Sequence, residues 1–355
     1  MVTSLPFSVF RSKITDALSQ AGAVDPAAPI EPARVSAVSK GGSRFQGRWK
    51  RPITAAIAVA VVSLGAFLLY RTLSQYQVDE IVQSLTSLSA LRLLVAAACA
   101  AGSYLCLTGF DWLAVRYAGK PLPWRKAAVA SFVSLSVGHN LGFAAVSSGA
   151  IRYRFYSRYG LSAGAIAKVI LFCGMTVGLG LSVLGGISVL LRPREAETML
   201  RLGGPLTTAI AIACLLVPTA YVVLAARVRK PLAVWSVSLA LPQWRLALAQ
   251  VIIGTVNFTF VAGCLYQTLL AIADLPFFAV ASAYVLANVA TLISHVPGGL
   301  GVIETVVLLV LGKPETIGAL IAFRFLYFLV PLALGGTLFL ITEAMLRGKT
   351  REAGR

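Results

Sequence analysis

Two short stretches place polar groups inside otherwise apolar sequence. Ser131–Tyr159 contains His139 and Asn140 between glycines, and Ser294–Glu304 contains His295 before a proline and several glycines. These are the two histidines of the chain. Each imidazole has two interpretations: it bonds a backbone carbonyl that the break leaves unpaired, or it binds a head group or proton in a polar cavity.

The second break favours a tight turn. Pro297 cannot continue the donor pattern of a helix, and the glycines after it permit close backbone approach: Gly298, Gly299 and Gly301. Free backbone N–H groups at the start of the following half-helix are suited to binding a phosphate.

Glu304 and Arg324 are charged residues at predicted membrane depth. An unpaired carboxylate is costly there, which makes Glu304 a candidate for function. Arg324 is the expected counter-charge. A structural ion pair and a pair that handles substrate are both compatible with this pattern.

The first stretch ends in a run of arginines and aromatic residues. Arg152, Arg154 and Arg158 are interleaved with four aromatic residues: Tyr153, Phe155, Tyr156 and Tyr159. Guanidinium groups bind phosphate through paired hydrogen bonds, and tyrosines favour the head-group level of a bilayer. The alternative is a solvated loop whose positive charge only sets the orientation of the protein.

The sequence shows no pattern for a metal, a cofactor or a catalytic triad. Neither histidine is accompanied by further ligands at metal-site spacing, and a nucleotide-binding loop is absent. We therefore expect no metal, no cofactor and no catalytic residues.

The composition predicts a helical membrane protein. Of 355 residues, 58% are hydrophobic and 12% are charged, with a mean hydropathy of +0.83; soluble domains carry about 25% charged residues. The formal charge of +18 sits in short clusters beside apolar runs, which favours contact with anionic lipid over nucleic acid.

We predict an all-α polytopic protein with eight apolar regions. Residues 1–52 and 344–355 are expected to be basic cytoplasmic tails around a membrane domain at 53–343, and Gln75–Ala90 to be an interfacial helix. Two regions are interrupted, around Ser131–Tyr159 and Pro276–Leu311. The other six are expected to be full spans: Ile53–Tyr70, Leu91–Val115, Ser162–Leu191, Leu206–Ala226, Trp244–Ala273 and Thr316–Thr342.

The distribution of charge favours a re-entrant hairpin at the first break. If Ala127–Ser148 enters and leaves on the cytoplasmic side, most of the 31 Lys and Arg residues are cytoplasmic, as are both termini. If it crosses, they divide almost evenly. With the hairpin, the second four regions run opposite to the first four, which is the pattern of an inverted repeat with a site at the membrane midplane.

Four segments together resemble a known family. They are GHNLGFAAVSSGAIRYRFYSRYGLS, LFCGMTVGLG, SHVPGGLGVIE and FRFLYFLVP. They resemble the membrane region of bacterial lysylphosphatidylglycerol synthase/flippase proteins (multiple peptide resistance factor) and related stand-alone membrane proteins, over about Thr54–Glu343.

The resemblance implies an inner-membrane lipid flippase or lipid-binding module for aminoacylated or anionic phospholipid of the phosphatidylglycerol class, linked to surface charge and cationic peptide resistance. Carried over by position, the matching residues are Arg152, Arg154, Tyr156, Pro297, Gly298, Gly299, Gly301, Glu304 and Arg324. Full-length family members also bear a cytoplasmic domain that uses charged tRNA. We see no such domain here, so enzymatic activity is not expected.

Two alternatives stay open. The chain could be the membrane subunit of a split aminoacyl-phosphatidylglycerol synthase or of a lipid-linked glycosyl pathway, or it could transport a small solute. The expected partners are phospholipid, a separate soluble aminoacyltransferase if one exists, and a second copy in a homodimer.

Overall fold

The computed structural model describes residues 78–86, 88–140, 144–228, 232–234, 237–239, 241–270, 274–311 and 316–352. All of them belong to one compact unit. The expected tail at 1–52 and the expected span Ile53–Tyr70 lie outside the described residues. The expected interfacial helix at Gln75–Ala90 corresponds to helix α3 (Val78–Thr86).

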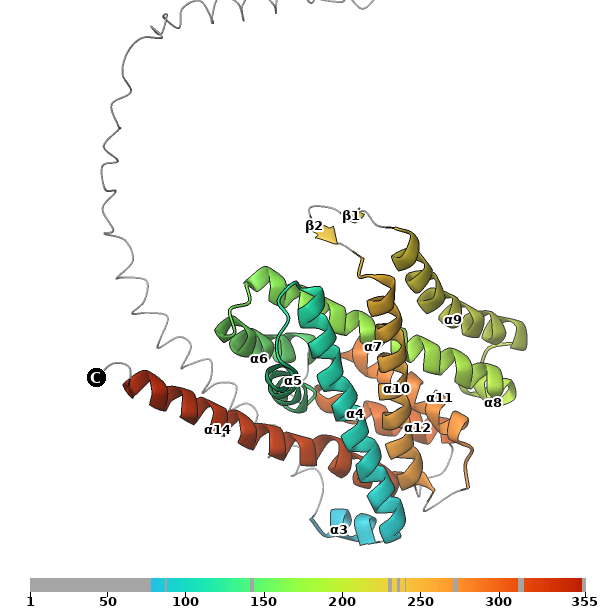
Figure 1. The fold of residues 1–355 in the computed structure, drawn as a ribbon. Coiled ribbons are helices and arrows are strands. Elements are labelled where there is room, and N and C mark those ends of the chain that lie inside the picture. Colours follow the sequence, from blue (N-terminus) through green and yellow to red (C-terminus); the bar gives the residue numbers. More distant parts are fainter. Residues whose placement is uncertain are drawn as a thin grey trace, which may run out of the picture. The chain divides into compact units, whose positions relative to one another are not determined.

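The described residues form a helical membrane protein, as predicted (Figure 1). After α3 the first elements are α4 (Ala90–Tyr117), α5 (Trp124–Gly138), α6 (Ala144–Arg158), α7 (Ala163–Leu191), α8 (Pro193–Leu200) and α9 (Gly204–Arg227). A short antiparallel pair follows between two predicted spans, β1 (Leu232–Val234) and β2 (Val237–Leu239).

The second series begins with α10 (Trp244–Leu269). It continues with α11 (Phe277–Ser294), the 3₁₀ turn η1 (Pro297–Gly299), α12 (Val302–Leu311), α13 (Thr316–Arg324), the π-helical turn η2 (Phe325–Leu329) and α14 (Val330–Glu352). Because α14 continues to Glu352, the domain boundary expected at 343 falls inside a helix.

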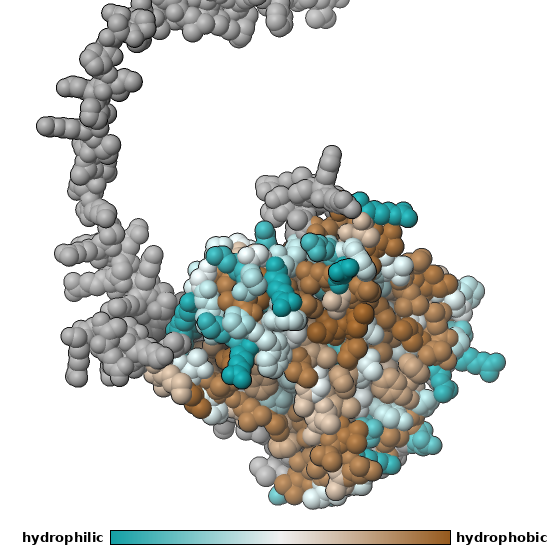
Figure 2. Space-filling view, viewed as in Figure 1, coloured by the Kyte–Doolittle hydropathy of each residue, from teal (hydrophilic) through white to brown (hydrophobic). Residues whose placement is uncertain are grey.

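Within the described ranges, six helices are long and apolar enough to cross a membrane. Five match predicted full spans: α4, α7, α9, α10 and the continuous stretch Thr316–Met345. The sixth is α11, which was expected to be part of an interrupted region. Figure 2 shows the outcome on one face: hydrophobic residues cover most of it, and hydrophilic ones gather toward the edge where α4 ends.

The two helices α4 and α10 pack antiparallel at the centre. The Arg92 guanidinium at the start of α4 donates to the Leu270 carbonyl at the end of α10, and Ser103 Oγ donates to Asn257 Oδ1 at 2.8 Å. In each series a long helix is followed by an interrupted hairpin and another long helix, and these leading helices run in opposite directions. This is the order that an inverted repeat requires.

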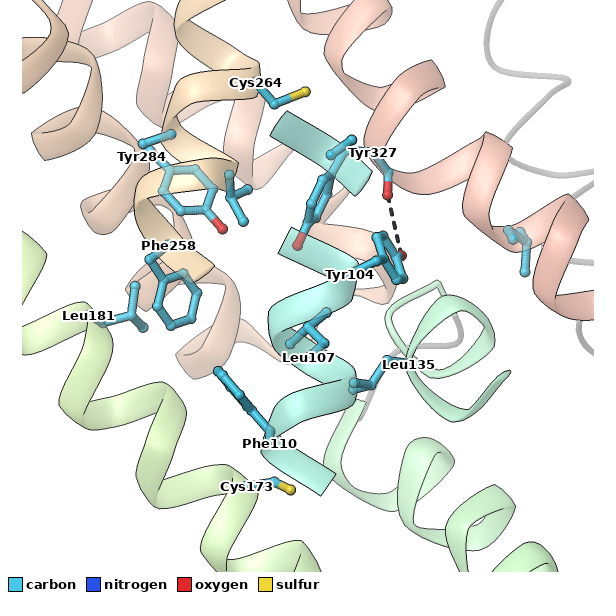
Figure 3. Close-up of a cluster of buried hydrophobic side chains, with 14 of the residues drawn as sticks. Tyr104, Leu107, Phe110, Leu135, Cys173, Leu181, Phe258, Cys264, Tyr284 and Tyr327 are labelled. Carbon is cyan, nitrogen blue, oxygen red and sulfur yellow. Dashed lines mark hydrogen bonds between the residues drawn. The ribbon is translucent and has the colours of Figure 1, made fainter. Parts of the chain in front are cut away.

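Small residues and polar contacts hold the helices together. A Cβ on Gly254 of α10 would lie 2.6 Å from the Thr176 carbonyl oxygen of α7, so these backbones touch. Tyr104 of α4 and Tyr327 of η2 belong to a buried aromatic cluster, and the Tyr104 hydroxyl donates to the Tyr327 carbonyl at 3.4 Å (Figure 3).

Candidate functional site

The first break ends α5 and turns the chain into a tight helical hairpin. A Cβ on Gly138 would lie 2.7 Å from Ser148 Cβ, so α5 and α6 meet closely at this end. The Ser147 hydroxyl donates to the Gly138 carbonyl at 3.1 Å, and Asn140 Nδ2 donates to the Ser136 carbonyl at 2.9 Å. Each helix has 15 residues, about 22 Å, which is short of a roughly 30 Å hydrocarbon core.

The second break ends α11 with left-handed backbone. His295 has φ 55° and its ring Nδ1 lies 2.8 Å from the Ile293 carbonyl oxygen, as the carbonyl-bonding interpretation of this histidine expects. Gly298 and Gly299 both have φ 59°, a region that glycine adopts without steric cost. A Cβ on Gly299 would also lie 2.7 Å from Thr291 Oγ1.

The two breaks meet. The Gly298 N–H donates to the His139 carbonyl at 3.1 Å, and a Cβ on Gly298 would lie 3.9 Å from Asn140 Oδ1. Two segments about 150 residues apart thus form one contact through their irregular backbone. We call this place the hairpin junction, defined by His139, Asn140, Gly298, Gly299, Glu304 and Arg324.

Arg324 holds the second half of the hairpin junction. Its Nη1 donates to the Gly298 carbonyl and its Nη2 to the Gly299 carbonyl, both at 2.8 Å. Its Nε and Nη2 form a two-point ion pair with Glu304, the second contact at 2.8 Å. The expected counter-charge is confirmed. The Arg324 side chain is 3% exposed and that of Glu304 18%, so the carboxylate is the more accessible partner.

An irregular helix turn lies directly after Arg324. Pro331 has no N–H to donate to the Tyr327 carbonyl, and the π-helical turn η2 alters the pattern around it. Side chains from elsewhere satisfy these carbonyls: Tyr104 donates to Tyr327 and Asn140 Nδ2 donates to Phe328 at 3.5 Å. The hairpin junction therefore contacts the most irregular turn of the last span.

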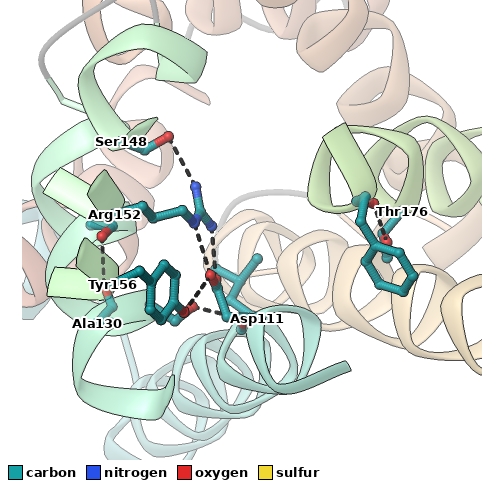
Figure 4. Close-up of polar contacts among 10 residues, drawn as sticks. Asp111, Ala130, Ser148, Arg152, Tyr156 and Thr176 are labelled. Carbon is teal, nitrogen blue, oxygen red and sulfur yellow. Dashed lines mark hydrogen bonds and ion pairs between the residues drawn. The ribbon is translucent and has the colours of Figure 1, made fainter. Parts of the chain in front are cut away.

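Arg152 and Tyr156 lie on a different, fully buried face of α6. Arg152 Nε and Nη2 donate to the two carboxylate oxygens of Asp111 on α4, at 2.9 and 2.8 Å (Figure 4). The Tyr156 hydroxyl also donates to Asp111, at 2.8 Å, and Arg152 Nη1 donates to Ser148 Oγ at 3.1 Å. In this conformation the side chains of Arg152 and Tyr156, for which we predicted lipid contact, are hydrogen-bonded to Asp111.

Arg154 and Arg158 lie on the opposite face of α6 and share a carboxylate from α14. Arg154 donates to both oxygens of Glu343 at 2.7 and 2.6 Å, and Arg158 donates to the same oxygens at 2.8 and 3.4 Å. The exposed fractions of the side chains are 10% for Glu343, 16% for Arg154 and 35% for Arg158. We call these three residues the α6–α14 cluster.

The remaining predicted residues take backbone positions. Pro297 opens the turn η1, and Gly301, with φ 75°, precedes α12, whose first turn contains Glu304. Among the described residues no group of three or more His, Cys, Asp and Glu side chains is arranged to hold a metal ion.

Sequence reasoning missed two residues, Asp111 and Glu343. Asp111 was not among the predicted site residues, and its side chain is 0% exposed. The sequence feature that could have identified it is a carboxylate inside an apolar run, two residues after a glycine. Such a carboxylate needs a cationic partner, and Arg152 supplies it. Glu343 is an isolated acid near the end of the last span, close in the predicted topology to the arginine run.

Comparison with known proteins identifies the family. A family model described as the lysylphosphatidylglycerol synthase TM region matches residues 53–335. An uncharacterized protein of Synechocystis sp., slr0712, is 33% identical over 285 residues, which cover 79% of this chain and 88% of that protein. The inner membrane protein YbhN of Escherichia coli is 28% identical over 323 residues, covering 88% and 99%. The chain is a multi-pass membrane protein that belongs to the family of the lysylphosphatidylglycerol synthase TM region.

Proposed function

We propose that this protein binds a phospholipid of the phosphatidylglycerol class, anionic or aminoacylated, and moves it between the two leaflets of the bacterial inner membrane. The observation that carries the proposal is the hairpin junction, where Gly298 contacts His139 beside a partly exposed carboxylate. Irregular backbone at membrane depth occurs where it is buried in protein or lines a polar path. Interrupted helices that meet in this way mark the substrate site of many transporters.

Glu304 is the group that selects the head group in this proposal. Arg324 holds the Glu304 carboxylate from one side, and 18% of the Glu304 side chain stays exposed. A lysyl head group carries ammonium groups, which a carboxylate attracts strongly in a low-dielectric site. Movement of such a lipid to the outer leaflet lowers the negative surface charge there, which would reduce binding of cationic peptides.

The proposed orientation places both termini in the cytoplasm. Three cation–π contacts lie at one end of the bundle: Arg116 over Trp112 at 3.5 Å, Arg245 over Trp244 at 5.5 Å and Lys126 over Tyr159 at 5.4 Å. Basic residues with Trp and Tyr are typical of the cytoplasmic interface of a membrane protein. We propose on the same ground that residues 53–343 are the membrane domain between the basic tails 1–52 and 344–355.

A leaflet-exchange assay tests the function. The full chain is reconstituted into liposomes that contain fluorescent lysylphosphatidylglycerol, and the fraction of label accessible to a membrane-impermeant quencher is followed over time. Exchange faster than in protein-free liposomes supports the proposal. Exchange at the protein-free rate, with the protein folded and inserted in both orientations, would overturn it.

A matched pair of variants connects the activity to the hairpin junction. Glu304→Gln keeps the side-chain shape and removes the charge, so we expect at least a tenfold slower exchange of the lysyl lipid. Asp274→Asn makes the same chemical change at an exposed position outside the hairpin junction and should exchange lipid at the wild-type rate. Equal rates for the two variants would contradict the role of Glu304.

A further inference from the structure

The helix α14 contacts the first hairpin at several points between Gly335 and Glu343. Gly335 of α14 packs against Ser136 of α5, and the Phe339 ring contacts Phe155 of α6 in a tilted arrangement with ring centroids 6.2 Å apart. Further along, Glu343 reaches the α6–α14 cluster. The opposite face of α14 is apolar and exposed, with Leu340 at 53%. The helix α14 therefore lies between the first hairpin and the outer surface of the bundle at this place.

The ion pairs of the α6–α14 cluster are more exposed and less regular than the buried pair between Arg152 and Asp111. One carboxylate accepts four hydrogen bonds from two guanidiniums, and the two made by Arg158 are unequal, at 2.8 and 3.4 Å. About a third of the Arg158 side chain is exposed. An ion pair at such a position contributes little net stability, because water and competing ions reach it. A second anion can therefore approach Arg158 without first unfolding the surroundings.

The other end of α14 has the features of a hinge. The π-helical turn η2 and Pro331 interrupt the regular hydrogen-bond pattern, and helices bend at such points. The carbonyls of Tyr327 and Phe328 already accept hydrogen bonds from side chains elsewhere, Tyr104 of α4 and Asn140 after α5. The angle between α13 and α14 can therefore change at η2 without breaking the hydrogen bonds of a regular helix.

We propose that the α6–α14 cluster is an exchangeable anion site, in which the phosphate diester of a phospholipid head group replaces the Glu343 carboxylate on Arg158 and Arg154 and releases α14 to move about η2. Both anions carry one negative charge and two oxygens that a guanidinium binds in the same forked geometry. The inference rests on the proposed function, because it takes phospholipid as the substrate. It adds Glu343 as the internal competitor that holds α14 against α6 until lipid arrives.

Spin-label distance measurements on the full chain test the exchange. Labels are placed at Leu340 of α14 and Ile252 of α10, both more than half exposed, in a background with the native cysteines replaced. A second pair, Ile252 and Leu171 of α7, serves as the control that should not change. The protein is solubilised in dodecyl maltoside, a detergent without phosphate. It is measured under three conditions: without additive, with added phosphatidylglycerol, and with inorganic phosphate.

Phosphatidylglycerol is expected to produce a second distance population for the α14 pair, shifted by about 5 Å, the size of a one-turn helix displacement. Glu343→Gln should show that population without lipid, while Glu343→Asp, which keeps the charge, should behave as the wild type. One unchanged population in the wild type with lipid and in Glu343→Gln would overturn the proposal. An equal shift with inorganic phosphate alone would overturn the assignment of a lipid ligand.

This experiment separates the two proposals. Detergent micelles have no leaflets, so movement of α14 is measured without any transport. If lipid moves α14 but leaflet exchange runs at the rate of protein-free liposomes, the anion-site proposal stands and the proposed flippase function is wrong. If leaflet exchange requires Glu304 but α14 does not move on adding lipid, the proposed flippase function stands and the anion-site proposal is wrong.

Discussion

The two faces of α6 use the same residue type in opposite ways. Ser148, Arg152 and Tyr156 are spaced four residues apart and all lie toward Asp111, where the ion pair is 4% and 0% exposed. Arg154 and Arg158 are also four apart, on the opposite face, and they share Glu343 with up to 35% exposure.

The difference shows that burial decides what an arginine in this motif can do. A guanidinium removed from water and held at two points by a carboxylate cannot leave it without a large cost. A partly exposed guanidinium in a shared pair can change partner. We therefore propose that Arg152 belongs to the fixed frame that joins α4 to α6, and that Arg154 and Arg158 are the arginines available to contact lipid.

The largest effect is expected for Asp111→Ala. This change leaves the Arg152 charge buried without its partner, which typically costs 3–5 kcal/mol, on the order of an entire folding free energy for some domains. The expected outcome is a strong fall in the thermal unfolding temperature in detergent, or loss of folded protein. Asp111→Ala with Arg152→Met removes both charges and should recover most of that loss. If Asp111→Ala alone were as stable as the wild type, the buried ion pair would not differ from the partly exposed one in its contribution to stability.

The next effect is expected for Arg324→Lys. Lysine keeps the charge but cannot bind Glu304 at two points while it also bonds the Gly298 and Gly299 carbonyls. Hydrogen bonds to charged groups contribute about 1.5–3 kcal/mol each, so both thermal stability and leaflet exchange should fall. Unchanged exchange would show that the hairpin junction does not depend on this geometry.

A smaller effect on stability is expected for Glu343→Gln. Because the α6–α14 cluster is partly exposed, its loss should change the free energy of unfolding by about 1 kcal/mol or less. Chemical denaturation monitored by tryptophan fluorescence measures the change. A loss as large as that of Asp111→Ala would contradict the contrast between the two faces.

The smallest effect is expected for Asp274→Asn. The side chain is exposed and lies before α11, away from both ion-pair faces. Surface changes of this kind are usually within 0.5 kcal/mol. The same denaturation measurement gives the baseline against which the other three variants are compared, and a larger loss would mean that unfolding in detergent does not report on individual contacts.

Local sequence predicted much of this fold because the bilayer constrains it strongly. Apolar length alone located five of the six candidate spans, and the two breaks were visible as glycine, proline and histidine inside apolar runs. That Glu304 pairs with Arg324 followed from the cost of an isolated charge at membrane depth. Each inference needed only the residues near one point of the chain and the properties of the solvent.

The partners of the α6 arginines could not be predicted in the same way. The spacing of Arg152, Arg154 and Arg158 is enough to place them on two faces, but not to say which helix packs against each face. Asp111 and Glu343 come from α4 and α14, which are distant in sequence, and their positions depend on how the helices pack. The contact between Gly298 and His139 likewise depends on tertiary packing, although the topology suggested that the two breaks form a pair.

The most direct test of the central claim is a structure of the full chain in lipid nanodiscs that contain lysylphosphatidylglycerol. We predict density for a head group within hydrogen-bonding distance of Glu304, at the place where Gly298 meets His139. Lipid density confined to the outer apolar surface, with the hairpin junction closed on itself as it is here, would contradict the claim that this junction is where the lipid binds.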